Sequence, residues 1–220
     1  MNNKKITSVV KSNPLSIIPL TISIALIFLF GCQKTSDEKN EVKSAITAEN
    51  LQTAYSKEVN RHKMYEAFFA RAEKDKMKQI ARLYRAIARS EEIHSLCNLK
   101  LLHSLGVDPK PPVDEYITVG TTPQTLKMAL SMEDIEYGTM YKNMIRCAEV
   151  ERHADCVKLL KAIQDAESKH AELLRYAIYK GKEMPALQYS VCNECGYLLT
   201  TEQTDECPVC KAKRETFEKL

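Results

Sequence analysis

The sequence predicts an all-α four-helix bundle with a small four-cysteine metal module at its C-terminal end. Two stretches of about 60 residues each, 46–105 and 122–180, are rich in the strong helix formers Ala, Glu, Lys, Arg, Leu and Met. A segment with three prolines, Gly106–Gly120, separates them. Two Cys-x-x-Cys pairs, which hold four of the chain's eight cysteines, follow within Val191–Cys210. The predicted domains are therefore a bundle at 47–181 and a module at 187–220.

The N-terminal residues have the features of a secretory signal. Lysines at positions 4, 5 and 11 precede an uncharged apolar run, Leu15–Phe30, and a small residue follows at Gly31. A positive start, an apolar segment and a small residue at a cleavage point are typical of exported proteins. The four residues Leu29–Cys32 resemble a bacterial lipobox, in which the chain is cut before the cysteine and the cysteine is acylated. We expect a signal peptide at residues 1–31, lipidation at Cys32 and a polar flexible linker at 32–46.

This leader predicts an extracytoplasmic, membrane-anchored lipoprotein, in the periplasm or on the cell surface of a bacterium. The alternative is an uncleaved membrane helix, for which the apolar run is short, because a spanning helix needs about 20 apolar residues. The whole chain has 32 Lys and Arg against 29 Asp and Glu, and residues 1–31 carry three of the lysines and no acid. The remainder is neutral, so we expect no nucleic-acid partner, which would require a basic surface.

Each helical stretch is expected to fold into a hairpin, because a single helix of about 60 residues would be about 90 Å long. The second stretch has clear ends, with Thr122 as predicted N-cap, Pro123 at the first helical position and Gly181 as C-terminal cap. The 15-residue segment between the stretches can reach about 50 Å when extended. It can therefore cross the length of hairpin helices of about 42 Å.

Six ligand-type residues recur at matched distances from the two expected turns. Each hairpin would carry one glutamate on its first helix and a Glu-x-x-His pair on its second, and residues three apart lie on one face of a helix. The midpoints between the glutamates fall between Lys74 and Asp75 and at Val150, in polar runs that suit turns. The six residues are Glu58 with Glu91 and His94, and Glu133 with Glu167 and His170.

This set has one glutamate from each of two helices and one Glu-x-x-His pair from each of the other two. It is the inward-facing ligand set of ferritin-like di-iron carboxylate proteins. Four carboxylates offset the repulsion between two cations, and imidazoles supply neutral nitrogen ligands. A lone Glu-x-x-His pair is more often a solvated helix face. Glu136, about one turn after Glu133, is a seventh candidate ligand. Tyr65 and Tyr141, about two turns past Glu58 and Glu133, either pack in the core or donate to a ligand carboxylate.

These motifs make the chain similar to rubrerythrins over nearly all of residues 47–220. The matching stretches are AYSKEVNRHKMY around Glu58, ARSEEIHS, ALSMEDIEYGTMY around Glu133 and Glu136, DAESKHAELLRY, and CNECGY with CPVC. The resemblance implies that Glu91 and Glu167 bridge two irons and that the two single glutamates are terminal ligands.

The resemblance also implies a ligand exchange and a dimer. One iron would exchange Glu136 for His94 on reduction, and His170 would hold the other iron. Rubrerythrins form homodimers in which one subunit's cysteine module lies near the di-iron site of the other subunit.

Four thiolates are expected to hold one further metal ion in the module. Their spacing alone allows zinc or iron in a tetrahedral site, with zinc the commoner structural occupant. The stretches CGY and CPVC resemble rubredoxin knuckles. An iron–tetrathiolate centre beside a di-iron site can carry single electrons, which zinc cannot. We therefore expect iron, with zinc as the alternative, at Cys192, Cys195, Cys207 and Cys210.

The resemblance implies a non-haem di-iron peroxidase with a role in oxidative stress. Hydrogen peroxide would be reduced to water at the di-iron site, and electrons would return one at a time through the cysteine centre. In the family these electrons start from NADH in the cytoplasm, so an exported chain is expected to use another, unidentified donor. The alternative is an iron-binding, ferroxidase or storage protein with a structural zinc in the module.

Overall fold

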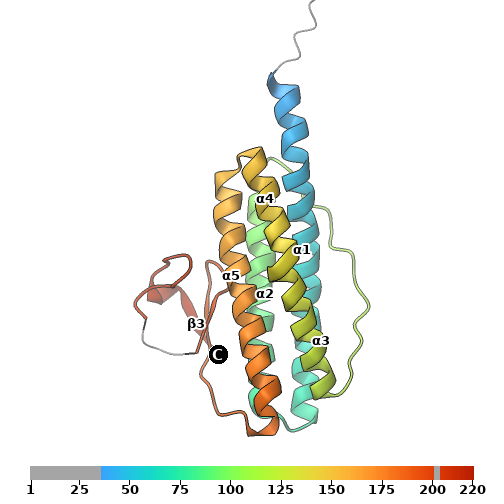
Figure 1. Cartoon of the computed structure of the whole chain (residues 1–220), viewed down its shortest axis with the longest axis vertical. Helices are drawn as coiled ribbons and strands as arrows, with labels where there is room; N and C mark the ends of the chain where they lie inside the picture. Colours follow the sequence, from blue (N-terminus) through green and yellow to red (C-terminus); the bar gives the residue numbers. More distant parts are fainter. Residues whose placement is uncertain (1–35, 201–203) are drawn as a thin grey trace, which may run out of the picture. The chain divides into compact units, whose positions relative to one another are not determined.

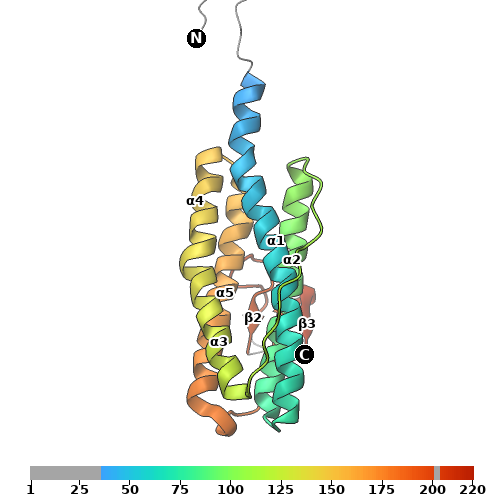
Figure 2. The same cartoon turned by 90° about the vertical axis from the view of Figure 1, so that its right-hand side faces the viewer.

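The computed structural model describes residues 36–200 and 204–220 and confirms the predicted four-helix bundle and four-cysteine module. The predicted signal peptide at 1–31 and the predicted lipidation of Cys32 lie outside the described residues. The helices run side by side, and the module follows the last of them (Figures 1 and 2).

Both predicted hairpins are present. In the first, α1 (Ser36–Lys74) and α2 (Lys78–Ser104) are joined by a turn at the first predicted midpoint. In the second, α3, the π-helical segment η1 and α4 follow one another without a break, and α5 returns after a turn in which Arg152 adopts a left-handed conformation. Their bounds are α3 Thr122–Ile135, η1 Glu136–Met140, α4 Tyr141–Glu151 and α5 Ala154–Lys180.

The start of α1 differs from the predicted flexible linker at 32–46, because the chain is helical from Ser36. Residues 36–46 contain no Gly or Pro and several Glu, Lys and Ala, so nothing in this stretch stops a helix from extending. Within residues 36–200 and 204–220, none of the helices is both long and apolar enough to cross a membrane.

The start of α3 is shifted by one residue from the prediction, with Thr121 rather than Thr122 as N-cap. Gln124 Oε1 accepts the Thr121 amide at 2.8 Å, which closes the first turn. Asp75, in the turn between α1 and α2, accepts both the amide of Thr122 at 3.0 Å and its hydroxyl at 2.8 Å. The turn of the first hairpin thus caps the first helix of the second.

The crossover between the hairpins is fastened along α1 by side chains four residues apart. Gln52 bonds both the amide and the carbonyl of Lys110, at 2.7 and 3.0 Å. Ser56 accepts the amide of Val113 at 3.1 Å, and Asn60 donates to the carbonyl of Val113 at 2.8 Å. Positions four apart lie on one helix face, so α1 presents a continuous polar track to the crossover.

The apolar core forms two clusters with a polar layer between them. On α1, Glu58 lies between Leu51 of one cluster and Phe68 of the other. The predicted ligands on α2 and α5 also lie between members of the two clusters, and α2 meets the clusters in the reverse order along the chain. The predicted ligands therefore lie at one depth, closed above and below by packed side chains.

The module is a three-stranded antiparallel sheet with strand order β2-β1-β3. Strand β1 (Ser190–Cys192) pairs with β2 (Leu198–Leu199) on one side and with β3 (Phe217–Lys219) on the other. A short 3-10 helix, η3 (Arg214–Thr216), leads into β3. A unit this small normally needs a metal or disulfides to hold its fold.

We predict that Asp75→Asn lowers the thermal unfolding midpoint at pH 7. Hydrogen bonds from Arg71 and from Thr122 hold the pKa of Asp75 below its usual range. A depressed folded-state pKa stabilises the protein above the unfolded value of about 3.9 and loses this effect as the pH falls. The midpoints of the wild type and the variant should therefore converge towards pH 2.

The control is Asp114→Asn, which removes the same charge from an exposed ion pair with Lys63 and should change the midpoint little. Equal midpoints for Asp75→Asn and the wild type between pH 2 and pH 7 would contradict the capping role.

Candidate metal centres

Six predicted ligand side chains from four helices meet in the polar layer of the bundle, and all six are fully buried. They form two overlapping sets of four, in each of which the ligand atoms lie within 4.8 Å of one another. Glu91 and Glu167 belong to both sets. The first set adds Glu58 and His94, and the second adds Glu133 and His170.

The two shared glutamates each direct one oxygen to each histidine. Glu167 Oε1 lies 2.9 Å from His94 Nδ1, and its Oε2 lies 2.9 Å from His170 Nδ1. Glu91 repeats the arrangement, with Oε2 at 3.3 Å from His94 Nδ1 and Oε1 at 3.3 Å from His170 Nδ1. This is the arrangement that two cations bridged by two carboxylates would require.

The cluster holds more buried carboxylates than its own cationic side chains can pair with. Burial raises the pKa of Glu58 and of Glu133, and the neighbouring charges of Glu91 and Glu167 raise it further. Buried oxygens without a hydrogen-bond partner in the described part of the chain include Glu58 Oε2 and Glu133 Oε2. Bound cations would stabilise the ionised form of these carboxylates, so the residues present fit a pair of metal ions.

Two tyrosines hold the single glutamates, Glu58 and Glu133, in place. The hydroxyl of Tyr65 donates to Glu133 Oε1, and that of Tyr141 donates to Glu58 Oε1. Both rings are fully buried. The sequence left two roles open for these tyrosines, and the geometry favours the one in which each hydroxyl bonds a predicted ligand. Each bond uses one carboxylate oxygen and leaves the other oxygen free to bind a cation.

Glu136, the seventh predicted ligand, does not join either set of four. It is buried at the start of η1 and pairs with Arg61, whose Nε lies 2.9 Å from Glu136 Oε1. Sequence reasoning missed both the π-helical segment and Arg61. A signal for Arg61 was present, since it lies three residues after Glu58 and therefore on the same face of α1.

The four cysteines of the module are brought together as predicted. The sulfurs of Cys192 and Cys210 lie 3.6 Å apart, and those of Cys195 and Cys207 lie 3.7 Å apart. A metal with bonds of about 2.3 Å to four sulfurs in a tetrahedron would hold them about 3.8 Å apart. The site therefore fits one tetrahedral zinc or iron ion.

The module contacts the polar layer of the bundle through Ser90, on α2. The Ser90 hydroxyl donates to the carbonyl of Gly196 at 2.5 Å. Because its proton is used there, Ser90 accepts from His170 Nε2 at 2.9 Å. The other ring nitrogen, Nδ1, is directed at the carboxylates, and in the neutral imidazole it would be the nitrogen that can bind a metal. Sequence reasoning missed Ser90, although it directly precedes Glu91.

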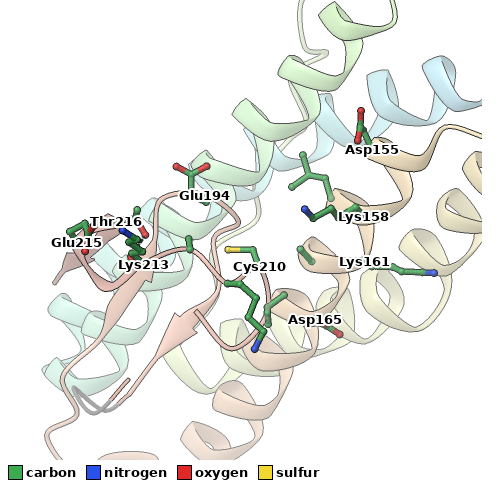
Figure 3. Close-up of a pocket in the computed structure, with 14 residues that line it drawn as sticks. Asp155, Lys158, Lys161, Asp165, Glu194, Cys210, Lys213, Glu215 and Thr216 are labelled. Atoms are coloured by element: carbon green, nitrogen blue, oxygen red, sulfur yellow. Dashed lines mark hydrogen bonds between the residues drawn. The ribbon is translucent and has the colours of Figure 1, made fainter. Parts of the chain in front are cut away.

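An open hollow of about 590 Å³ lies where the module faces α5 (Figure 3). Cys210, the only one of the four cysteines that is not fully buried, lines it together with charged residues of both signs. Those labelled include Lys158 and Asp165 on α5 and Glu194 and Lys213 in the module. The hollow gives solvent access to one edge of the cysteine site.

Comparison with known families gives two matches. A family model described as Rubrerythrin matches residues 49–178, and one described as Rubrerythrin, rubredoxin-like domain, matches residues 191–218. The first covers the bundle and all seven predicted carboxylate and imidazole ligands, and the second covers the four cysteines. Such proteins carry a di-iron site and a rubredoxin-like iron site, and both clusters of side chains fit this.

Curated relatives align over most of the chain. Nigerythrin of Nitratidesulfovibrio vulgaris is 31% identical over 188 residues, which cover 83% of this chain and 89% of the relative. Rubrerythrin-2 of Clostridium acetobutylicum is 27% identical over 180 residues, or 80% of this chain and 98% of the relative. A solved structure of nigerythrin in its fully reduced, all-ferrous state superposes with a TM-score of 0.73 at 30% identity, covering 79% of this chain and 86% of that chain.

We predict that Glu91→Gln loses tight binding of two divalent ions in the bundle, because Glu91 belongs to both sets of four. Titration of the metal-free full chain with Co²⁺, followed by its visible absorption, measures this loss. Glu92→Gln is the matched control, since Glu92 is the next residue, lies outside both sets and pairs with Arg89 near the surface. Equal Co²⁺ binding by the two variants would contradict the assignment of the cluster.

We predict that Gly196→Ala displaces the module from α2. Gly196 has φ +76°, and a Cβ there would overlap His94 Nε2 and lie 2.8 Å from Ser90 Oγ. Gly106→Ala is the matched control, because Gly106 has φ +73° and open space around it. Overpacking should cost Gly196→Ala about 1–3 kcal/mol more than the control.

Thermal unfolding and protease sensitivity of the segment 184–189 measure the effect of Gly196→Ala. Equal losses in the two variants would show that the contact of Gly196 with α2 does not hold the module.

Proposed function

The chain belongs to the rubrerythrin family, and on that premise we propose that it is a non-haem di-iron peroxidase that reduces hydrogen peroxide to water. Its family domains support an oxidative-stress peroxidase role. The observation that carries the proposal is the pair of glutamates, Glu91 and Glu167, that each direct one oxygen to each of two buried histidines.

Two ferrous ions, when bound, would supply the two electrons that convert one hydrogen peroxide and two protons into two waters. The chain's own residues prepare the place for this. The shared glutamates and the two histidines would hold the ions, and the tyrosine hydroxyls of Tyr65 and Tyr141 keep the terminal glutamates in position. The apolar clusters on both sides exclude bulk water, so electrostatic interactions within the layer are strong.

We propose iron rather than zinc in the cysteine site, and a short route from it to the bundle. Gly196 follows the ligand Cys195 directly, and its carbonyl accepts from Ser90, which in turn accepts from His170. These contacts are formed within one chain. An exchange of modules between two chains would preserve the same contacts, so the proposed homodimer is compatible with this route.

The electron donor is proposed to approach the edge of the module at Cys210. That cysteine lines the open hollow in Figure 3, whereas the other three are fully buried. The leader pattern supports a location outside the cytoplasm with a lipid anchor at Cys32. NADH is not available there, so the proposed donor is a different reductant.

Peroxide addition to the reduced holoprotein tests the function. We predict about three irons per chain, a red colour from the ferric cysteine site, and rapid oxidation with one peroxide consumed per two electrons. The Glu91→Gln protein, with its cysteine site loaded, is the control and should consume peroxide only slowly.

A reduced wild-type protein that peroxide does not oxidise rapidly would contradict the peroxidase. Uptake of many more irons per chain with a colourless, zinc-filled module would instead indicate the iron-binding or storage protein.

A further inference from the structure

Arg61 is a buried cation in the wall of the proposed di-iron site. It lies on α1 three residues after Glu58, and only 8% of its surface is exposed. Its Nε donates to Glu136 Oε1 at 2.9 Å. Since burial of a charge is tolerated only with a close partner, Arg61 and Glu136 hold each other in place.

Glu136 is the one predicted ligand that stays outside both sets of four. Its second oxygen, Oε2, is buried and has no hydrogen-bond partner among the described residues. Glu136 lies about one helical turn after Glu133, which belongs to the second set, so it is near the cluster. It has the chemistry and the position of a ligand but is engaged elsewhere.

The backbone around Glu136 supports a functional role for this arrangement. Glu136 begins the π-helical segment η1, which separates it from the regular helix that carries Glu133. Single π-helical turns inside helices are frequent at functional sites, because they re-aim side chains. Here the turn begins at the residue whose carboxylate faces Arg61.

Arg61 also has a second acidic neighbour on its outer side. Its guanidinium lies 3.7 Å from Glu115 Oε2, in the crossover, and 48% of the Glu115 side chain is exposed. Both residues line a hollow of about 230 Å³ between α1, α3 and the crossover. Arg61 therefore lies between the half-exposed Glu115, at the hollow, and the buried Glu136.

We propose that Arg61 is a positioning residue that holds Glu136 away from the metal pair and thereby makes the bound irons easier to reduce. The inference rests on the di-iron site proposed above. One fewer carboxylate on the metals, and one fixed positive charge beside them, both disfavour the more highly charged ferric state relative to the ferrous state.

The midpoint potential of the di-iron pair in Arg61→Gln holoprotein tests this inference. Release of Glu136 should raise the preference for ferric over ferrous iron about tenfold, which lowers the potential by about 59 mV for a one-electron couple. Arg85→Gln is the charge-matched control, because Arg85 is exposed on α2 and stacks on Phe69. Arg61→Lys keeps the charge and should stay close to the wild-type potential.

A double-mutant cycle separates positioning from charge alone. With Glu136→Gln as background, Arg61→Gln should lower the potential much less, because no carboxylate remains to be released. The double variant also removes both members of the buried pair, so it stays measurable if Arg61→Gln alone does not fold.

Co²⁺ titration of the metal-free full chain gives a second readout that needs neither iron nor peroxide. If Glu136 is released in Arg61→Gln, it should add a ligand to the bound Co²⁺, and the higher coordination number of the ion should weaken its visible absorption. Adding Glu136→Gln to that variant should reverse the change. Potentials that match Arg85→Gln, or an equal shift with and without Glu136, would overturn the inference. These potentials are measured without peroxide, so a protein that lacks peroxidase activity but shows the shift would contradict only the proposed function.

Discussion

The burial of five carboxylates in one layer of the bundle is the constraint on which the rest of the structure depends. Glu58, Glu91, Glu133 and Glu167 are fully buried, and Glu136 is 2% exposed. Water cannot solvate these groups, and the two imidazoles and one guanidinium beside them do not satisfy all their oxygens. A pair of bound metal cations would resolve this imbalance. The packed clusters on both sides keep the layer dry, and the tyrosine hydroxyls limit which oxygens remain for metals.

The same layer connects the bundle to the cysteine module. A histidine that offers Nδ1 to a metal has its other nitrogen available on the outer side, and Ser90 accepts from that nitrogen in His170. Ser90 then donates to the backbone of Gly196. Gly196 can lie this close because it has no Cβ and adopts a positive φ. One hydroxyl therefore contacts both a predicted ligand and the backbone of the module.

Helical periodicity made much of the site predictable. Glu-x-x-His puts two metal-binding side chains on one helix face, and equal distances from a turn put Glu58 level with Glu91. Six residues could therefore be placed together from the sequence alone. Most of the features that escaped prediction come from contacts between remote segments. The pairing of Arg61 with Glu136, the link from Ser90 to Gly196 and the capping of α3 by Asp75 leave no local pattern. The helical start of α1 at Ser36 also escaped, because polar helix formers were interpreted as a linker.

Anomalous X-ray scattering from crystals of the iron-loaded protein tests the central claim most directly. Data collected above and below the iron absorption edge should give three peaks per chain. Two should lie between Glu91 and Glu167, one on the side of His94 and one on the side of His170, and the third should lie among the four cysteine sulfurs. A bundle that crystallises with its carboxylates in this layer but shows no iron between Glu91 and Glu167 would contradict the account.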